Sequence, residues 1–178
     1  MRTGIGYDAH RFRDGMHVIL GGVRIPHDKA LDGHSDADVL LHAIMDAVLG
    51  AAGGPDVGVL FPNDDPTYLG ISSLELAAAV RRRILGMGFQ VTQIDCVLIA
   101  EEPKISPHRQ AMVRAISSAF GVAEQFVAVK ATTNEGMGFV GRREGICAIA
   151  VALLGDAGSS SGAGPGPRAS PCEGVGLQ

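Results

Sequence analysis

Two short stretches of the chain carry aspartate and histidine at spacings that suit a metal site. Asp8 and His10 are two residues apart, so their side chains share one side of the backbone if the chain is extended there. His42 lies in an apolar stretch with helical spacing, with Asp38 one turn before it and Asp46 one turn after it. One carboxylate and two imidazoles leave the fourth position of a catalytic zinc site open. We therefore interpret Asp8, His10 and His42 as candidate metal ligands.

Each part of this set also has a plainer interpretation. An aspartate and a histidine near the end of a strand are more often only solvated. A carboxylate one helical turn from His42 can form an exposed pair worth roughly a few tenths of a kcal/mol. If a metal binds, Asp46 would instead orient His42 from behind. The spacing alone leaves these interpretations open.

Two further polar segments suit phosphate. His34 and Ser35 precede the helical stretch, where free N–H groups favour an anion, although Ser35 or the aspartates after it can simply cap the helix. The run Lys130–Glu135 ends a strand with hydroxyls, an amide and a carboxylate, which suit phosphate with a hard cation such as Mg²⁺ or, more simply, a polar turn. The glycine-rich run 136–145 fits no nucleotide-binding fingerprint.

A small set of strands and helices must hold these residues in place. The segments 27–37 and 55–71 read as irregular, and the second is long enough for a functional lid. Alternation, caps and turn residues predict strands over 2–8, 91–100, 126–132 and 145–154, a hairpin over 17–26 around Gly21-Gly22, and helices over 38–50, from Ser72 to about Leu85, and from Ser106 to Phe120.

This order of elements indicates an α+β (mixed α/β) fold, a two-layer sandwich in which a mixed sheet carries its helices on one face. The other face of the sheet must then be covered, and packing against another subunit is a natural way to cover it. Gly4 and Gly6 in the first strand predict a close approach of backbone or ligand.

Composition fixes the broad class of protein. The 178 residues suffice for one domain with a real core, which we place at 1–155, followed by a Gly/Ser/Pro-rich disordered tail at 156–178. The net charge of −4 argues against a nucleic-acid-binding protein, and no apolar run reaches the ~20 residues of a membrane span. Three cysteines without metal-site spacing, and a start without a hydrophobic signal segment, favour the cytoplasm.

Seven blocks of the sequence together resemble one family. They read, in order, GYDAHRF, GGVRIP, HSDADVLLHAIMDAVLGAA, DVGVLFP, PKISPH, KATTNEGMGF and GRREGI. Their order and spacing over residues 2–154 are similar to those of the 2-C-methyl-D-erythritol 2,4-cyclodiphosphate synthase family. The resemblance implies a lyase of isoprenoid precursor biosynthesis that cyclises 4-diphosphocytidyl-2-C-methyl-D-erythritol 2-phosphate and releases CMP.

The resemblance also implies cofactors, partners and site residues. It implies one Zn²⁺ per subunit on Asp8, His10 and His42, and Mg²⁺ or Mn²⁺ near Glu135 bridging the substrate diphosphate. It implies a homotrimer with its sites between subunits, and a central cavity that can hold an isoprenoid diphosphate. Its implied catalytic residues are His34 and Thr133, its cavity residues are Phe139 and Arg142, and its other substrate contacts are Asp8, His10, Ser35, Asp56, Gly58, Phe61, Pro62, Asn63, Asp64, Asp65, Ala100, Glu101, Glu102, Pro103, Lys104, Ile105, Ser106, Thr132, Asn134 and Glu135.

Three positions depart from the family pattern. Ala37 replaces a usual glycine, which matters if the backbone there needs a positive φ. Asn63 replaces a common aspartate, which puts a substrate hydroxyl contact in doubt, and Asn134 replaces a frequent threonine beside Glu135. Two other functions fit the same residues: a metal-dependent phosphohydrolase that uses water as the nucleophile, and a non-catalytic trimer that binds an isoprenoid diphosphate.

Overall fold

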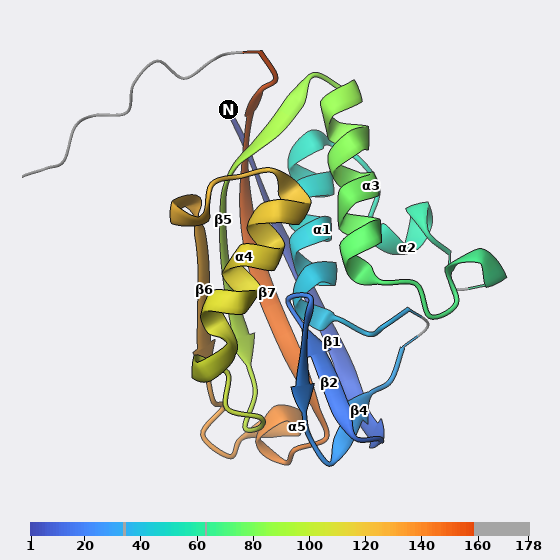
Figure 1. Ribbon diagram of the computed structural model, residues 1–178, viewed down its shortest axis with the longest axis vertical. Helices are drawn as coiled ribbons and strands as arrows, with labels where there is room; N and C mark the ends of the chain where they lie inside the picture. Colours follow the sequence, from blue (N-terminus) through green and yellow to red (C-terminus); the bar gives the residue numbers. More distant parts are fainter. Residues whose placement is uncertain (34, 63, 159–178) are drawn as a thin grey trace, which may run out of the picture.

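The computed structural model describes residues 1–33, 35–62 and 64–158. Its centre is a five-stranded mixed sheet in the order β4-β1-β7-β5-β6, with β5 and β6 parallel and the other neighbours antiparallel. Figure 1 shows α1, α3 and α4 side by side on one face of it. The strands are β1 (Arg2–Asp14), β4 (Lys29–Leu31), β5 (Phe89–Ile99), β6 (Val127–Thr132) and β7 (Gly145–Asp156), with a separate hairpin of β2 (His17–Leu20) and β3 (Val23–Pro26).

Three long helices and several short ones complete the fold. The long helices are α1 (Val39–Ala52), α3 (Ser73–Gly86) and α4 (Arg109–Phe120), and the short ones are α2 (Val57–Leu60), α5 (Gly138–Gly141) and 3₁₀ turns at Pro66–Tyr68, Ser106–His108 and Glu124–Phe126. This architecture confirms the mixed sheet with helices on one face. Within the part of the chain that the structure describes, every helix is too short or too polar to cross a lipid bilayer.

Backbone-to-backbone packing places α1 against β1. A Cβ atom on Gly4 would lie 2.1 Å from the carbonyl oxygen of Ala47, and one on Gly6 would lie 2.0 Å from that of Ala43. Real Cβ atoms do not approach so closely, so only glycine allows this contact. The predicted close approach is therefore confirmed, and the partner is the backbone of α1. Residues of β1 at even positions face this helix.

The opposite face of the sheet carries exposed apolar side chains. Ile5 pairs with Val151 and Tyr7 pairs with Ile149 across the β1–β7 ladder. Ile5 is 71% exposed and Tyr7 is 55% exposed, and their partners are also open to solvent. A contiguous apolar patch of this kind on one face is typical of a surface that another molecule covers.

Two elements lie in segments that the sequence predicted to be irregular. β4 forms within 27–37, where its three residues pair with Phe12–Asp14 at the end of β1. β1 therefore extends well beyond residue 8, where the sequence predicted its end. α2 forms within 55–71, where Asp56 accepts a hydrogen bond from Val59 N–H at 2.9 Å. Neither segment has enough periodic residues to predict an element from the sequence. Both elements form because contacts with distant parts of the chain stabilise them.

The start of the helix predicted from Ser106 and the end of the last strand also differ from the predictions. Ser106 makes no side-chain capping bond, and the α-helix begins only at Arg109 after a 3₁₀ turn. Asp156, which composition placed in the tail, is the last residue of β7 and pairs with Phe89. The rest of the predicted tail, from residue 159 onward, lies outside the described residues.

Candidate metal and active site

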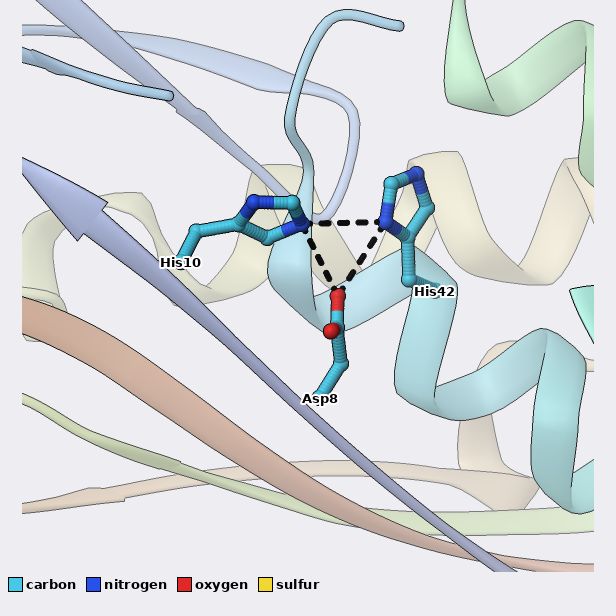
Figure 2. A group of neighbouring side chains, drawn as sticks. All are labelled: Asp8, His10 and His42. Atoms are coloured by element: carbon cyan, nitrogen blue, oxygen red, sulfur yellow. Dashed lines mark hydrogen bonds and ion pairs between the residues drawn. The ribbon is translucent and has the colours of Figure 1, made fainter. Parts of the chain in front are cut away.

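β1 and α1 bring the three candidate ligands together, as Figure 2 shows. Asp8 and His10 follow Gly4 and Gly6 on the face of β1 that packs against α1, and His42 lies in the first turns of that helix. His10 Nε2 lies 3.0 Å from Asp8 Oδ2, and His42 Nδ1 lies 3.1 Å from the same oxygen. The two ring nitrogens are 3.2 Å apart. The predicted set therefore converges on one point.

The second nitrogen of each imidazole has an oxygen partner away from that point. His10 Nδ1 lies 2.6 Å from the backbone carbonyl of Asp32, which can only accept, so this nitrogen carries the proton. His42 Nε2 lies 3.1 Å from the hydroxyls of both Ser35 and Ser73. With protons on these outer nitrogens, both inner nitrogens present lone pairs to each other and to the Asp8 carboxylate.

Three electron-rich atoms facing one another fit a bound cation. Bonds of about 2.0–2.2 Å place the ligand atoms of a tetrahedral zinc site about 3.3–3.5 Å apart, close to the separations seen here. Burial opposes ionisation of Asp8, but the hydrogen bonds and positive charge that His10 and His42 bring when they are protonated outweigh burial and lower the pKa of this carboxyl. Burial also disfavours protonation of His10, yet the hydrogen bond and charge of Asp8 raise its pKa overall. Both directions are those expected where positive charge, either an imidazolium proton or a bound cation, sits beside the Asp8 carboxylate.

Asp38 does not belong to this cluster. It is fully buried, it caps α1, and it accepts hydrogen bonds from the backbone N–H groups of Leu40 and Leu41. Its carboxylate also accepts from Gly21 N–H at 2.9 Å and Gly22 N–H at 2.6 Å, in the β2–β3 turn. Asp38 therefore fixes the start of the helix that carries His42, and it joins that helix to the hairpin.

The orienting role considered for Asp46 is wrong. Asp46 accepts a hydrogen bond from Val57 N–H at 2.8 Å, so it tethers the first residue of α2 to α1. The groups that contact the outer nitrogen of His42 are Ser35 and Ser73. Sequence reasoning missed Ser73. Its neighbour Ser72 is the capping residue of α3, so the two serines were interpreted only as part of an ordinary capping pattern.

A cleft of about 200 Å³ opens beside the three candidate ligands. Of the predicted substrate contacts outside the metal set, Ser35, Gly58 and Phe61 line it. Asp56 caps α2, and Asp65 caps the 3₁₀ turn at Pro66–Tyr68 by accepting from Thr67 N–H. The segment with Pro62 and Asp64 connects these two turns, whereas His34 and Asn63 lie outside the described residues.

The predicted residues after β5 and β6 form a second group. The hydrogen bond from Ala100 N–H to Thr132 C=O, 3.0 Å, joins the starts of these two loops. Glu101 Oε1 accepts from the N–H groups of Asn134 at 3.0 Å and Gly136 at 3.2 Å. These bonds hold a turn in which Glu135 has φ of +52° and accepts a hydrogen bond from the Thr133 hydroxyl at 2.7 Å.

Glu102 lies within a second group of potential ligands, with His27 and Asp28. Lys29 Nζ is 3.1 Å from the Glu102 carboxylate, and an Arg143 guanidinium nitrogen is 3.5 Å from it. These two cations already supply the positive charge that a metal would bring, so the first group is the better metal site. In the remainder of the predicted run, Pro103 is half-buried, Ile105 is buried, and Lys104 and Ser106 are exposed.

One chain does not bring the two predicted groups together. Asp8 is level with Ala148, Ala148 with Leu98, and Leu98 with Ala131, so the metal cluster and the end of β6 lie in one row across the sheet. β7 and β5 stand between them. Three strand spacings separate the two groups by about 14 Å.

Comparison with known proteins places this geometry in a family. The model of the YgbB family matches residues 1–155. The chain belongs to the YgbB family. A 2-C-methyl-D-erythritol 2,4-cyclodiphosphate synthase of Desulfatibacillum aliphaticivorans is 53% identical over 154 residues, which cover 86% of this chain and 99% of that protein. The family resemblance inferred from the seven sequence blocks is thereby confirmed.

Some YgbB-family relatives are longer than this chain. A bifunctional enzyme IspD/IspF of Brucella abortus is 52% identical, and the match covers 86% of this chain but 40% of that enzyme. The bifunctional IspDF structure of Campylobacter jejuni superposes with a TM-score of 0.83 at 38% identity, covering 86% of this chain and 42% of that one. An IspF of Plasmodium falciparum, solved as a CDP complex, superposes with a TM-score of 0.76 at 33% identity and covers 87% and 96%.

Ala37 is the departure from the YgbB-family pattern that the structure explains. Its φ is +56°, so the position does require the left-handed conformation that glycine adopts most easily. Its side chain is nonetheless buried, at 2% exposure. Of the two predicted cavity residues, Phe139 is 39% exposed in α5, and Arg142 pairs with Glu144 at 2.7 Å.

Proposed function

We propose that this chain converts 4-diphosphocytidyl-2-C-methyl-D-erythritol 2-phosphate into 2-C-methyl-D-erythritol 2,4-cyclodiphosphate with release of CMP, as a lyase of isoprenoid precursor biosynthesis. The observation that carries this conclusion is the convergence of Asp8, His10 and His42 in a chain that matches a cyclodiphosphate synthase over 99% of that enzyme's length. The relative solved as a CDP complex supports a cytidine nucleotide as part of the substrate.

The chain is a metal-dependent enzyme, and we assign the metals by ligand chemistry. Two imidazole nitrogens and one carboxylate oxygen suit Zn²⁺, one per subunit, with a fourth position left for substrate. The carboxylate of Glu135 would suit Mg²⁺ or Mn²⁺, which would neutralise charge on the substrate diphosphate. Such cations supply charge neutralisation and polarise phosphate oxygens when they are bound.

The reaction asks the protein for positioning, because the substrate supplies its own nucleophile. An oxygen of the 2-phosphate forms a bond to the β-phosphorus. The bond from that phosphorus to the oxygen shared with the α-phosphate breaks, and CMP leaves with the oxygen and its electron pair. Asp8, His10 and Ser35 line the cleft that would hold the diphosphate. We assign His34 and Thr133 to transition-state stabilisation.

We propose that the complete site forms between subunits of a homotrimer. The metal cluster and the Thr132–Glu135 turn lie at the same level of the sheet but three strands apart, so a neighbouring subunit's β6 edge would bring the second group to the first. The same neighbour would supply Ala100–Ser106, which contacts that turn. The exposed apolar face around Ile5 and Tyr7 would pack toward the threefold axis. Phe139 and Arg142 would line a central cavity for an isoprenoid diphosphate.

Mixing two inactive variants tests the shared site. His42→Ala and Glu135→Ala should each abolish CMP release, because each removes one half of every site. In randomly mixed trimers about one site in four combines both intact halves, so co-refolded variants should recover about a quarter of the wild-type activity. No recovery on mixing, or a monomer by light scattering at the assay concentration, would contradict a site between subunits.

Product analysis separates the two rival functions. A phosphohydrolase on the same scaffold would use water and yield linear phosphates, which phosphorus NMR distinguishes from the cyclic diphosphate. A non-catalytic binding protein would release no CMP. Retention of full activity and zinc content in His42→Ala would refute the metal assignment.

We also propose a cytoplasmic location, which the unpaired buried thiols of Cys96 and Cys147 support.

A further inference from the structure

We propose that Ser73, held by Asp36, is a positioning residue for His42, and that it fixes the tautomer with which His42 faces the metal. The inference rests on the proposed metal-binding function. Ser73 is the first residue of α3 and is fully buried, and its hydroxyl oxygen lies 3.1 Å from His42 Nε2. The same hydroxyl donates a short hydrogen bond to the Asp36 carboxylate. Ser73 N–H donates to the other oxygen of that carboxylate at 2.9 Å.

The directions of these hydrogen bonds follow from counting protons. A carboxylate has no proton, so the single hydroxyl proton of Ser73 points to Asp36. The Ser73 oxygen can then only accept from His42, and Nε2 of that ring must carry its proton. The lone pair of His42 therefore lies on Nδ1, which faces Asp8 Oδ2 at 3.1 Å. A carboxylate–hydroxyl–imidazole chain of this kind orients the ring and makes it a better ligand.

This arrangement also determines what Ser35 can do. The Ser35 hydroxyl lies 3.1 Å from the same Nε2, but that nitrogen has only one proton to donate. Among the described residues, His42 is the one donor that reaches the Ser73 oxygen, so the His42 proton goes to Ser73 and the Ser35 hydroxyl is left to donate elsewhere. Ser35 lines the cleft, so its hydroxyl can donate to a phosphate oxygen there.

Ser73 also links His42 to the segment 57–71, which lies within the candidate lid predicted over 55–71. The chain between α2 and α3 ends at Ser73, and Asp36 N–H donates to Ile71 C=O at 3.2 Å just before it. At the other end of the segment, Asp46 holds Val57 at 2.8 Å. Both ends of the 57–71 segment are thus attached to groups that flank His42, and Ser73 is the attachment that contacts the imidazole directly.

Metal affinity tests the proposal without recourse to activity. Zn²⁺ affinity of the full chain is measured by competition with a chelator, and Ser73→Ala should weaken it about 10- to 100-fold, the usual effect of removing such a partner. Ser72→Ala is the matched control, because Ser72 caps the same helix through Leu74 N–H at 3.3 Å. That variant loses helix-capping stability but should bind Zn²⁺ as the wild type does.

A double-mutant cycle tests the role of Asp36. Asp36→Asn keeps the shape of the side chain and should weaken Zn²⁺ binding in the wild-type background but not in the Ser73→Ala background, because Asp36 acts through Ser73. The absorption spectrum of the Co²⁺-loaded protein should change in Ser73→Ala and not in Ser72→Ala. If Ser73→Ala fails to fold, Asp36→Asn and its cobalt spectrum still provide the test.

The outcomes separate this proposal from the metal assignment. A Ser73→Ala affinity within twofold of the wild type, an equal loss in Ser72→Ala, or an additive effect of Asp36→Asn would overturn the positioning role. His42→Ala serves as the reference for the site itself. If it binds Zn²⁺ like the wild type, the metal assignment is wrong and the proposal falls with it. If it loses Zn²⁺ while Ser73→Ala does not, only the positioning role is refuted.

Discussion

Replacing Asp38 should cost more stability than any ordinary helix cap, because its carboxylate serves two elements. Oδ1 accepts from Gly21 at 2.9 Å, from Leu40 at 3.1 Å and from Leu41 at 3.0 Å, and Oδ2 accepts from Gly22 at 2.6 Å. The side chain is fully buried, so water cannot replace it at these four N–H groups.

The cost of each substitution can be worked out from these contacts. In Asp38→Ala, loss of the cap costs about 1 kcal/mol. The N–H groups of Gly21 and Gly22 lose their acceptor in a buried turn, at about 1–3 kcal/mol each. The expected loss in the free energy of unfolding is therefore about 3–7 kcal/mol. Asp38→Asn keeps Oδ1 for three donors and turns an amide toward Gly22, so it should cost about 1–3 kcal/mol.

Urea unfolding followed by far-UV circular dichroism measures both losses, since the chain has no tryptophan for a fluorescence signal. Protein concentration is held fixed because the proposed assembly would contribute to stability. Asp56→Ala is the control. Asp56 also caps a helix, but it is exposed and its capping bond comes from Val59 N–H, so its loss should cost less than about 1 kcal/mol. The reasoning fails if Asp38→Ala costs no more than this control, or if the Asn and Ala variants cost the same.

Three further substitutions have definite expected results. Gly6→Ala places a Cβ 2.0 Å from Ala43 C=O, so it should lower the free energy of unfolding by about 1–3 kcal/mol and weaken Zn²⁺ binding; unchanged urea midpoint and affinity would contradict the close packing. Ala37→Gly should raise the free energy of unfolding by about 0.5–1 kcal/mol, because φ is +56° there, and a measured loss would refute that strain. Asp46→Ala frees Val57 N–H, so steady-state kinetics should show a raised KM while chelator competition shows unchanged Zn²⁺ affinity; a large loss of affinity would restore its orienting role.

The candidate ligands could be predicted from the sequence because local periodicity places them. Asp8 and His10 share a face in any strand, and His42 lies on a stretch with strong helical spacing. Gly4 and Gly6 predicted a close contact, although the sequence did not indicate that α1 makes it. The hairpin around Gly21 and Gly22 was likewise predictable, because its turn needs positive φ and glycine adopts it easily. Both positions do have positive φ.

The supporting groups could not be predicted, because their partners are distant in sequence. Ser73 contacts His42 across 31 residues and Asp36 across 37. The bond from Val57 to Asp46 joins a helix to a segment with no periodicity of its own. Propensities and spacing describe neighbours along the chain, whereas these hydrogen bonds exist only once the sheet and helices have packed.

The alternation of β1 connects catalysis with assembly. Its even positions run from Gly4 and Gly6, which admit α1, to the candidate ligand Asp8, while its odd positions Ile5 and Tyr7 form the open apolar face. A slip of one residue against β7 would turn both apolar side chains toward α1 and move Asp8 to the outer face. The register that assembles the metal cluster is therefore the same register that exposes the proposed subunit interface. A chain with β1 in the wrong register would lose both the metal cluster and the proposed subunit interface. The single register of β1 against β7 therefore determines both parts of a site completed by a neighbouring subunit.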